Sequence, residues 1–238
     1  MRVVLLTTDT THHTYYAWKI NEVFPLQAIF LETRCGQPPF NTAHPFEVQR
    51  IEYERQELLK GFSGDISHLA NTYKVENINE AACLEQLITL QPQLILVFGT
   101  GKLSSAVIKL PPLGCLNLHG GDPERYRGLD THLWAIYHRE FDQLITTLHY
   151  VDEELDTGEV IFKAKLPIQY GLQLYQLRAV NTRICVQLSL LALTSLQKLG
   201  WLPSVKQMQM GRYYSYMPTE LKEICVKRFQ KYTNGLKH

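Results

Sequence analysis

The segment Leu94-Ile95-Leu96-Val97-Phe98 is a run of five apolar residues, and Gly99-Thr100-Gly101 follows it directly. A short apolar run without polar alternation is typical of a strand in a parallel sheet that helices cover on both faces. Glycine after such a strand permits a positive φ or a close approach of the backbone to a ligand. The segment therefore predicts a central strand that leads into a ligand-binding loop.

Similar apolar runs before and after this strand indicate an α/β fold. We expect further strands over residues 3–6, 28–31, 115–119, 146–151 and 159–166. Apolar residues at helical spacing predict helices over residues 15–23, 45–60, 79–90, 172–199 and 221–232. Pro25 ends the first of these helices, and Asn79 is expected to cap the third. The opening of the chain thus reads as a βαβ unit.

Composition excludes several classes of protein. The 238 residues carry 24 Lys and Arg against 23 Asp and Glu, which lacks the basic excess of a nucleic-acid-binding chain. The five cysteines form no CxxC pair, so we expect reduced, mostly buried thiols and neither a disulfide framework nor a zinc site. The first apolar run is too short for an export signal, and no apolar run approaches the ~18 residues of a membrane span. A cytoplasmic protein is expected.

Asn117 and His119 stand two positions apart in the predicted strand 115–119, so their side chains lie on one side of it. An amide and an imidazole there could both donate hydrogen bonds to one oxygen. A carboxylate from the later acidic loop 152–158 could orient the imidazole or take a proton. This is acyl-transfer chemistry in outline. The alternative is a core histidine that donates to a main-chain carbonyl, and the spacing alone does not decide between the two.

Four motifs in order make the pattern far more specific than any one of them. They are Leu116-Asn117-Leu118-His119-Gly120, Arg125-Tyr126-Arg127-Gly128, Thr131-His132-Leu133-Trp134-Ala135-Ile136 and Leu155-Asp156-Thr157-Gly158. Together they resemble the core of the folate-dependent formyltransferases, which include methionyl-tRNA, glycinamide ribonucleotide and sugar N-formyltransferases. The resemblance implies a Rossmann-like, mostly parallel sheet with helices on both faces. It places a formyltransferase catalytic domain at residues 1–200 and a short C-terminal tail at residues 201–238.

The resemblance also implies that the chain binds N10-formyltetrahydrofolate and passes its formyl group to an amine. Asn117, His119 and Asp156 fall on the catalytic residues of the family. The first two are expected to donate to the oxyanion, while Asp156 stabilises the protonated imidazole and accepts the ammonium proton. No metal is required. The residues expected to bind the folate are Thr100, Gly101, Lys102, Leu103, Val151, Asp152 and Leu155.

Departures from the family bear on the acceptor. No glycine stands in the segment 7–13, where a phosphoribosyl-binding loop would lie, and residues 200–238 are short for a tRNA-binding domain. The resemblance therefore favours the amino group of a nucleotide-linked amino sugar, with thymidine diphosphate as the expected nucleotide. The substrate-binding residues are expected to be Thr10, His132 and Trp134. Alternatives are another small-molecule amine, hydrolysis of formyltetrahydrofolate, or a folate-binding remnant without activity.

Several further residues have a functional and a structural interpretation. The tyrosines at 213, 214 and 216 could stack on a base or form a homodimer interface, but packing of the tail on the core is favoured. His12 and His13 are expected to be solvated loop residues, and His149 a structural residue on its strand. The arginines at 125 and 127 are expected to fix loop geometry. The segment Gly120-Gly121-Asp122-Pro123-Glu124 differs from the family and leaves its acceptor contacts open.

Overall fold

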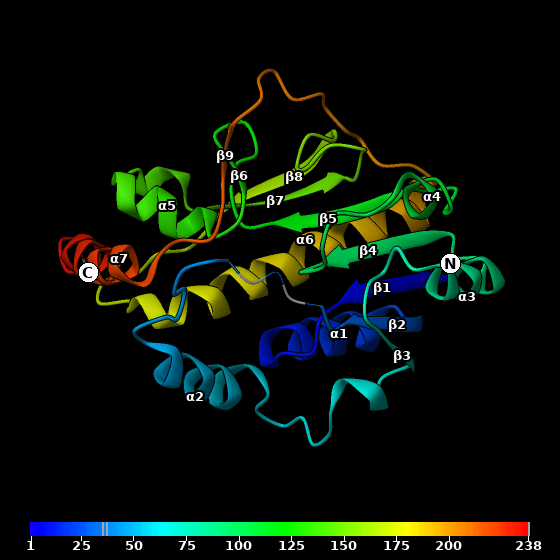
Figure 1. Cartoon of the computed structure of the whole chain (residues 1–238), viewed down its shortest axis with the longest axis horizontal. Coiled ribbons are helices and arrows are strands. Elements are labelled where there is room, and N and C mark those ends of the chain that lie inside the picture. The colour runs from blue at the N-terminus through cyan, green and yellow to red at the C-terminus, as the bar shows by residue number, and fades with distance from the viewer. Residues whose placement is uncertain (35, 37, 238) are drawn as a thin grey trace.

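The computed structural model describes residues 1–34, 36 and 38–237. Its centre is a seven-stranded sheet in the order β3-β2-β1-β4-β5-β7-β8 (Figure 1). The strands are β1 (Val3–Thr7), β2 (Leu26–Glu32), β3 (Asn71–Val75), β4 (Leu94–Phe98), β5 (Cys115–His119), β7 (Ile145–Tyr150) and β8 (Val160–Lys165). The first five are parallel, and β7 and β8 are antiparallel to their neighbours. The predicted mostly parallel sheet is confirmed.

Helices α1 (Thr11–Val23) and α6 (Leu177–Leu199) cover one face of this sheet, and α3 (Ala81–Leu90) and α4 (Ser105–Ile108) cover the other. Helix α2 (Glu47–Leu58) packs on α1 and α6, whereas α5 (Thr131–His138) and α7 (Thr219–Thr233) pack on each other. Val3 and Leu5 of β1 pack with α1 and α6 in one core, whereas Val4 and Leu6 pack with α3 and α4 in the other. Because strand side chains alternate between faces, β1 is apolar at every one of these positions.

Helix α6 crosses one face of the sheet (Figure 1). The helical stretch Leu174–Leu199 is long and apolar enough to span a membrane by length and composition. However, 61% of its apolar 18-residue segment is buried inside the structure. Its residues Ala192 and Leu193 are completely buried in the core that also holds Leu5. The apolar character of this helix therefore reflects its place in the core.

The tail, residues 201–238, contributes a strand and a helix to the fold. Strand β9 (Arg212–Tyr214) pairs in parallel with β6 (Tyr126–Gly128) to form a second, two-stranded sheet. Arg127 fastens this region, since its Nε donates to Gly211 O and its Nη1 to Leu155 O. Helix α7 lies against α5 (Figure 1), and their apolar side chains share a third core. The division at residue 200 stays a prediction.

Two expectations about local structure are wrong. His12 and His13 are buried because α1 begins at Thr11 and turns both rings toward the core, where His13 lies edge-on to Phe98 with ring centres 4.6 Å apart. Burial lowers the pKa of His13 to about 3, so it stays neutral at physiological pH.

Asn79 does not cap α3, whose cap residue is Glu80. The amide of Asn79 instead accepts from Ser104 N at 2.6 Å and donates to Lys102 O at 2.8 Å. It thereby joins the start of α3 to the loop after β4. The cysteines at 83, 115, 185 and 225 are free and buried, as expected, whereas Cys35 lies outside the described residues.

Candidate active site

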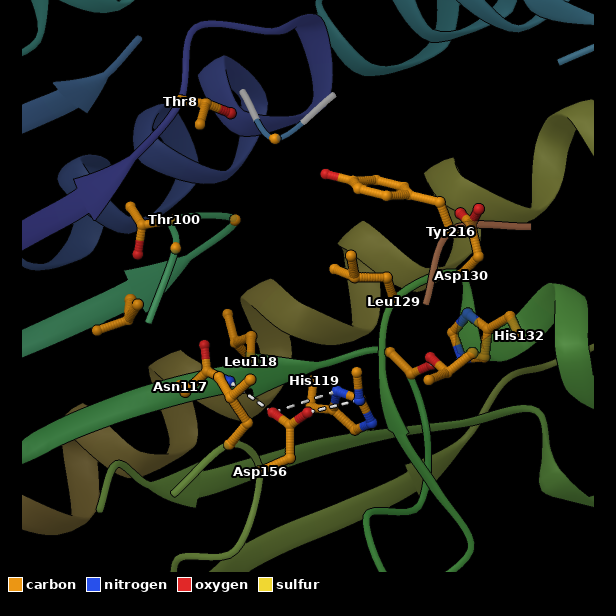
Figure 2. Close-up of a pocket in the computed structure, with 18 of the residues that line it drawn as sticks. Thr8, Thr100, Asn117, Leu118, His119, Leu129, Asp130, His132, Asp156 and Tyr216 are labelled. Carbon is orange, nitrogen blue, oxygen red and sulfur yellow. Dashed lines mark hydrogen bonds and ion pairs between the residues drawn. The ribbon is translucent and has the colours of Figure 1, made fainter. Parts of the chain in front are cut away.

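A cavity of about 690 Å³ opens at the carboxyl ends of the parallel strands. Thr8 follows β1, Gly99 follows β4 and Gly120 follows β5, and all three residues line it. This edge is where open α/β sheets bind ligands, because the loops that leave the strands there surround a crevice. Figure 2 shows Thr8 and Thr100 facing Tyr216 across the cavity, with Asn117, His119 and Asp156 at its floor.

The three residues expected to be catalytic meet at one point. Asp156 Oδ1 lies 3.5 Å from Asn117 Nδ2 and 3.5 Å from His119 Nδ1. Asn117 and His119 come from β5, whereas Asp156 comes from the loop between β7 and β8. The side chains of His119 and Asp156 are 5% and 10% exposed, so the contact is largely shielded from water. Shielding strengthens the electrostatic interaction between imidazole and carboxylate.

One ring nitrogen of His119 is hydrogen-bonded to the backbone. Its Nε2 lies 2.6 Å from Tyr126 O, and a carbonyl only accepts, so Nε2 carries the proton. Burial lowers the pKa of His119, opposed by the charge of Asp156. The ring is therefore neutral at pH 7, and its Nδ1 lone pair is turned toward Asp156. Both interpretations from the sequence hold at once, since the ring donates to a main-chain carbonyl and keeps a basic nitrogen in the cavity wall.

Asp156 is held as a carboxylate in an uncommon backbone conformation. Burial acts to raise its pKa, but His119, His149 and the Gly128 N–H outweigh this and bring it well below the usual range. The Gly128 N–H donates to Oδ2 at 2.8 Å. Asp156 has a φ of 57°, in the left-handed region that aspartate and asparagine tolerate better than most residues. The carboxylate is thus ionised and fixed before any substrate binds.

His149 belongs to this cluster, although the sequence indicated only a structural residue. Its Nδ1 lies 2.7 Å from Tyr150 O, which assigns the proton to Nδ1 and leaves Nε2 as an acceptor. Asn117 Nδ2 then donates to His149 Nε2 at 3.1 Å. The two residues stand opposite each other in the β5–β7 pairing. The register of β5 against β7 brings His149 to the site, and no local sequence pattern predicts that register.

The hydrogen bonds of Asn117 change the role expected for it. Its amide nitrogen faces His149 and Asp156, so the amide oxygen points away from Asp156 on the cavity side (Figure 2). In this orientation Asn117 offers the cavity an acceptor, where the sequence analysis expected an oxyanion donor. An acceptor there can hold an N–H of an incoming amine.

All seven residues expected to bind the folate line the cavity. They are Thr100, Gly101, Lys102 and Leu103 on one wall, and Val151, Asp152 and Leu155 on another. Glu32, which the sequence analysis missed, fixes the first wall from the end of β2. Its buried carboxylate accepts from Gly101 N at 2.7 Å and from Ile78 N at 3.1 Å. A charged acceptor for two backbone N–H groups holds a loop more strongly than neutral partners would.

Glu32→Gln is expected to raise the KM for the folate about tenfold while kcat changes less than twofold. The glutamine amide can accept only through its oxygen, so it releases one of the two backbone N–H groups, at about 1–3 kcal/mol. Steady-state kinetics with varied folate would measure the effect. Glu76→Gln, an exposed change close to the end of β3, is the control. An unchanged KM in Glu32→Gln would show that the loop does not depend on this carboxylate.

Gly158 closes the loop that carries Asp156 and leaves no room for a side chain. A Cβ there would lie 1.8 Å from Tyr150 O, a backbone atom that cannot move aside cheaply. Gly158→Ala is expected to lower the free energy of unfolding by about 3 kcal/mol, the upper range for an overpacked site. Gly61→Ala, with a positive φ but open space around it, is expected to lose only about 1 kcal/mol. Urea unfolding of both variants would check the difference.

The residues expected to bind the acceptor are only partly at the cavity. His132 lines it, and its Nε2 lies 2.7 Å from Ile145 O; burial lowers its pKa to about 4. Thr10 does not line it, because its hydroxyl bonds to the buried rings of His12 and His13. Trp134 also lies elsewhere, since its ring stacks on Tyr214 and its Nε1 donates to Ser215 O.

The tyrosines of the tail divide between two roles. Tyr213 and Tyr216 line the cavity, whereas Tyr214 stacks on Tyr126 and Trp134. The tail therefore packs on the core through one tyrosine and reaches the cavity with the other two. Within residues 1–34, 36 and 38–237, no cluster of histidine, cysteine and acidic side chains is placed to hold a metal ion.

Known proteins match this chain in sequence and in fold. The sequence profile of the formyl transferase family matches residues 49–184, more than half of the chain. A methionyl-tRNA formyltransferase from Methylacidiphilum infernorum is 34% identical over 105 residues, which are 44% of this chain and 32% of that enzyme. The match thus spans less than a third of the length of that relative.

Solved structures share the fold at low sequence identity. A 4-N formyltransferase from Francisella tularensis superimposes with a TM-score of 0.61 at 14% identity, over 96% of this chain and 87% of the other. The formyltransferase PseJ from Anoxybacillus kamchatkensis gives a TM-score of 0.51 at 16% identity, over 90% and 85%. That structure holds a formamido sugar nucleotide and tetrahydrofolate. At these identities the likeness establishes the fold alone.

Proposed function

The chain belongs to the formyl transferase family, and on that premise we propose that it moves a formyl group from N10-formyltetrahydrofolate to an amine. The observation that carries the proposal is the meeting of Asn117, His119 and Asp156 at the floor of the cavity. A neutral imidazole beside a fixed carboxylate can accept a proton and then be stabilised as a cation. Formyl transfer to a neutral amine requires such a proton acceptor.

In the proposed mechanism, the amine nitrogen attacks the formyl carbon and becomes positively charged while the carbonyl oxygen becomes an oxyanion. His119 Nδ1 takes the proton from the nitrogen, and the imidazolium that forms is stabilised by Asp156 at 3.5 Å. The oxygen of Asn117 holds an N–H of the attacking amine. When the bond from the formyl carbon to N10 breaks, His119 returns the proton to N10, so that tetrahydrofolate leaves as a neutral amine. During this interval the positive charge of the imidazolium also stabilises the nearby oxyanion.

The extent of the cavity supports transfer over hydrolysis. The folate walls occupy one side, and beyond Asn117 and His119 the cavity continues to Phe46, Leu174 and Tyr216. A water molecule needs about 30 Å³, so a hydrolase would not require this second region. The second region suits an organic acceptor that binds together with the folate.

For the acceptor, we propose the amino group of a nucleotide-linked sugar. Tyr213 and Tyr216 on the cavity wall support this, because aromatic rings can stack on a nucleotide base. The two formyltransferase structures with a similar fold add support, since one of them holds a sugar nucleotide. Methionyl-tRNA is the acceptor in the name of the sequence relative, which makes it the competing proposal.

The test is to incubate the protein with N10-formyltetrahydrofolate and a panel of amines, and to follow products by mass spectrometry. The panel contains amino sugars linked to thymidine or uridine diphosphate, unlinked amino sugars and methionyl-tRNA. A formylated sugar nucleotide formed in equal amount with tetrahydrofolate is the expected result. Formate without any formylated amine would identify a hydrolase, and absence of both products would overturn the proposed activity.

A further inference from the structure

Among the residues that line the cavity are three basic side chains that the proposed mechanism does not use. Arg50 comes from α2, Arg178 from the start of α6, and His44 from the segment just before α2. The three residues are distant in sequence, and the packing of α2 beside α6 brings them to one wall. Arginine is rarely buried, so the position of Arg50 here calls for a physical reason.

Arg50 is buried but not fully bonded. Only 7% of the residue is exposed, and its Nη2 donates to the carboxylate of Glu47 at 2.5 Å. Its Nε is buried and has no hydrogen-bond partner. A guanidinium has five N–H donors, and the single nitrogen that meets Glu47 leaves most of them unused. The guanidinium is therefore left with N–H donors that no described protein group satisfies.

Arg178 is held rigidly at the same wall. Its Nε and Nη2 donate at 2.6 Å to the two oxygens of Glu54, whose side chain has no exposed surface. A bidentate contact to a buried carboxylate fixes the plane of the guanidinium, so its remaining edge is presented without further ordering. The positive charge of Arg178 also lowers the pKa of its neighbour Arg50, after the larger effect of burial. The two guanidinium groups therefore reinforce one another at this wall.

His44 adds a neutral donor. Its Nε2 lies 3.3 Å from Lys222 Nζ, and since an ammonium group only donates, Nε2 is the acceptor and Nδ1 carries the proton. That Nδ1 is buried without a partner. Burial, followed by the charges of Arg50, Lys222 and Arg178, lowers the pKa of His44 to about 2. The three neighbouring cations make the electrostatic potential at this wall positive, and the His44 ring stays neutral for that reason as well as because it is buried.

The unsatisfied atoms at this wall share one property. Arg50 Nε and His44 Nδ1 are both N–H donors, so the ligand that would satisfy them is an acceptor. The local carboxylates are already engaged, with Glu47 on Arg50, Glu54 on Arg178, and Asp130 3.3 Å from Lys222. A free anion is the group that fits donors of this kind. Carboxylate and phosphate both have the required geometry.

We propose that Arg50, with Arg178 and His44, binds an anionic group of the acceptor and so selects amines that carry a carboxylate or a phosphate. This inference rests on the proposed formyl transfer and names the chemistry by which its acceptor is recognised. The anion is held by these three residues while the amine reaches Asn117 and His119. A neutral amine of the same size lacks this contact and binds weakly.

The test compares three acceptors that differ in one group: an amino sugar phosphate, an amino sugar acid and the neutral amino sugar. For Arg50→Gln, the KM for the preferred anionic acceptor is expected to rise at least tenfold. The KM for the neutral amine and the affinity for the folate are expected to change less than twofold. Arg50→Lys, which keeps the charge, is expected to recover part of the loss. The preferred acceptor identifies the anion as phosphate or carboxylate.

Arg55→Gln is the matched control, because Arg55 stands on the same helix but is exposed and does not line the cavity. Equal KM values for charged and neutral acceptors, or equal effects of Arg50→Gln and Arg55→Gln, would overturn the proposal. Thermal unfolding checks that Arg50→Gln folds. If it does not, His44→Phe removes the Nδ1 donor and keeps the ring, and a threefold to tenfold rise in KM for the anionic acceptor is expected.

A direct binding measurement separates this inference from the proposed function. Pyrophosphate, inorganic phosphate and acetate are titrated into the wild-type protein and into Arg50→Gln by calorimetry, with no turnover required. Binding of one of these anions to the wild type that weakens at least tenfold in Arg50→Gln supports the anion site even if no amine is formylated. Equal binding to both proteins, or to neither, contradicts the site even if formyl transfer is found.

Discussion

Replacing Asp156 by asparagine is expected to lower kcat by about 10²–10⁴-fold, the range for loss of a group that supports proton transfer. The substitution keeps the shape of the side chain and removes the charge that stabilises the imidazolium of His119. Asparagine also tolerates the φ of 57° at this position, so the loop should keep its conformation. Steady-state and single-turnover kinetics would measure the effect.

The pH profile distinguishes the proposed role of Asp156 from a structural one. Asp156 raises the pKa of His119, so its neutralisation lowers that pKa further. Because His119 must be unprotonated to accept the proton, activity falls as pH drops through its pKa. The acid limb of kcat/KM in Asp156→Asn is therefore expected to lie at lower pH than in the wild type. An acid limb that does not move, with little loss of kcat, would contradict the electrostatic role.

Replacing His119 by alanine is expected to lower kcat at least ~100-fold, because the other two histidines described at the floor of the cavity are turned to other partners. His149 has its proton on Nδ1 and uses Nε2 to hold Asn117, and His132 is turned to Ile145. The binding of folate should persist, since its walls do not include His119. Folate binding by fluorescence and turnover by tetrahydrofolate release would separate the two steps.

His68→Ala provides the control, because His68 is exposed and lies outside the cavity. A loss in His119→Ala that is matched by His68→Ala would reflect general instability. Near-full activity of His119→Ala would reject the proposed mechanism outright. Circular dichroism checks that the variant folds, since alanine leaves Tyr126 O without its partner.

The sequence predicted the buried part of the fold well, because short continuous apolar runs bounded by turn residues are typical of buried strands. Strand β4 was recognisable for that reason, and β7 and β8 were recognisable from the alternation of apolar and polar residues on either side of an acidic loop. Strand β3 was missed because Asn71–Val75 is an edge strand with a polar, half-exposed sequence. Strands β6 and β9 are three residues each and pair across more than 80 positions of chain. Such pairing leaves no local pattern.

The part of the site that could be predicted from the sequence is the part carried by the family motifs. Asn117, His119 and Asp156 carry the family pattern, and the structure brings them together. His149 was not predictable as a member, because its contact depends on the register of β5 against β7. The amide orientation of Asn117 follows from that contact and was missed with it. Trp134 was placed at the substrate by resemblance, whereas its position depends on Tyr214 from the far end of the chain.

The pairing of β6 with β9 sets the order in which the site can form during synthesis. Tyr126 O and Gly128 N–H, which hold His119 and Asp156, lie on β6, and its partner β9 is made more than 80 residues later. A contact of such high sequence separation pays a large loop-closure entropy and is expected to form late. A nascent chain is therefore expected to complete most of the central sheet before the proposed catalytic groups are held in place. The proposed activity is expected to appear only after β9 has paired with β6.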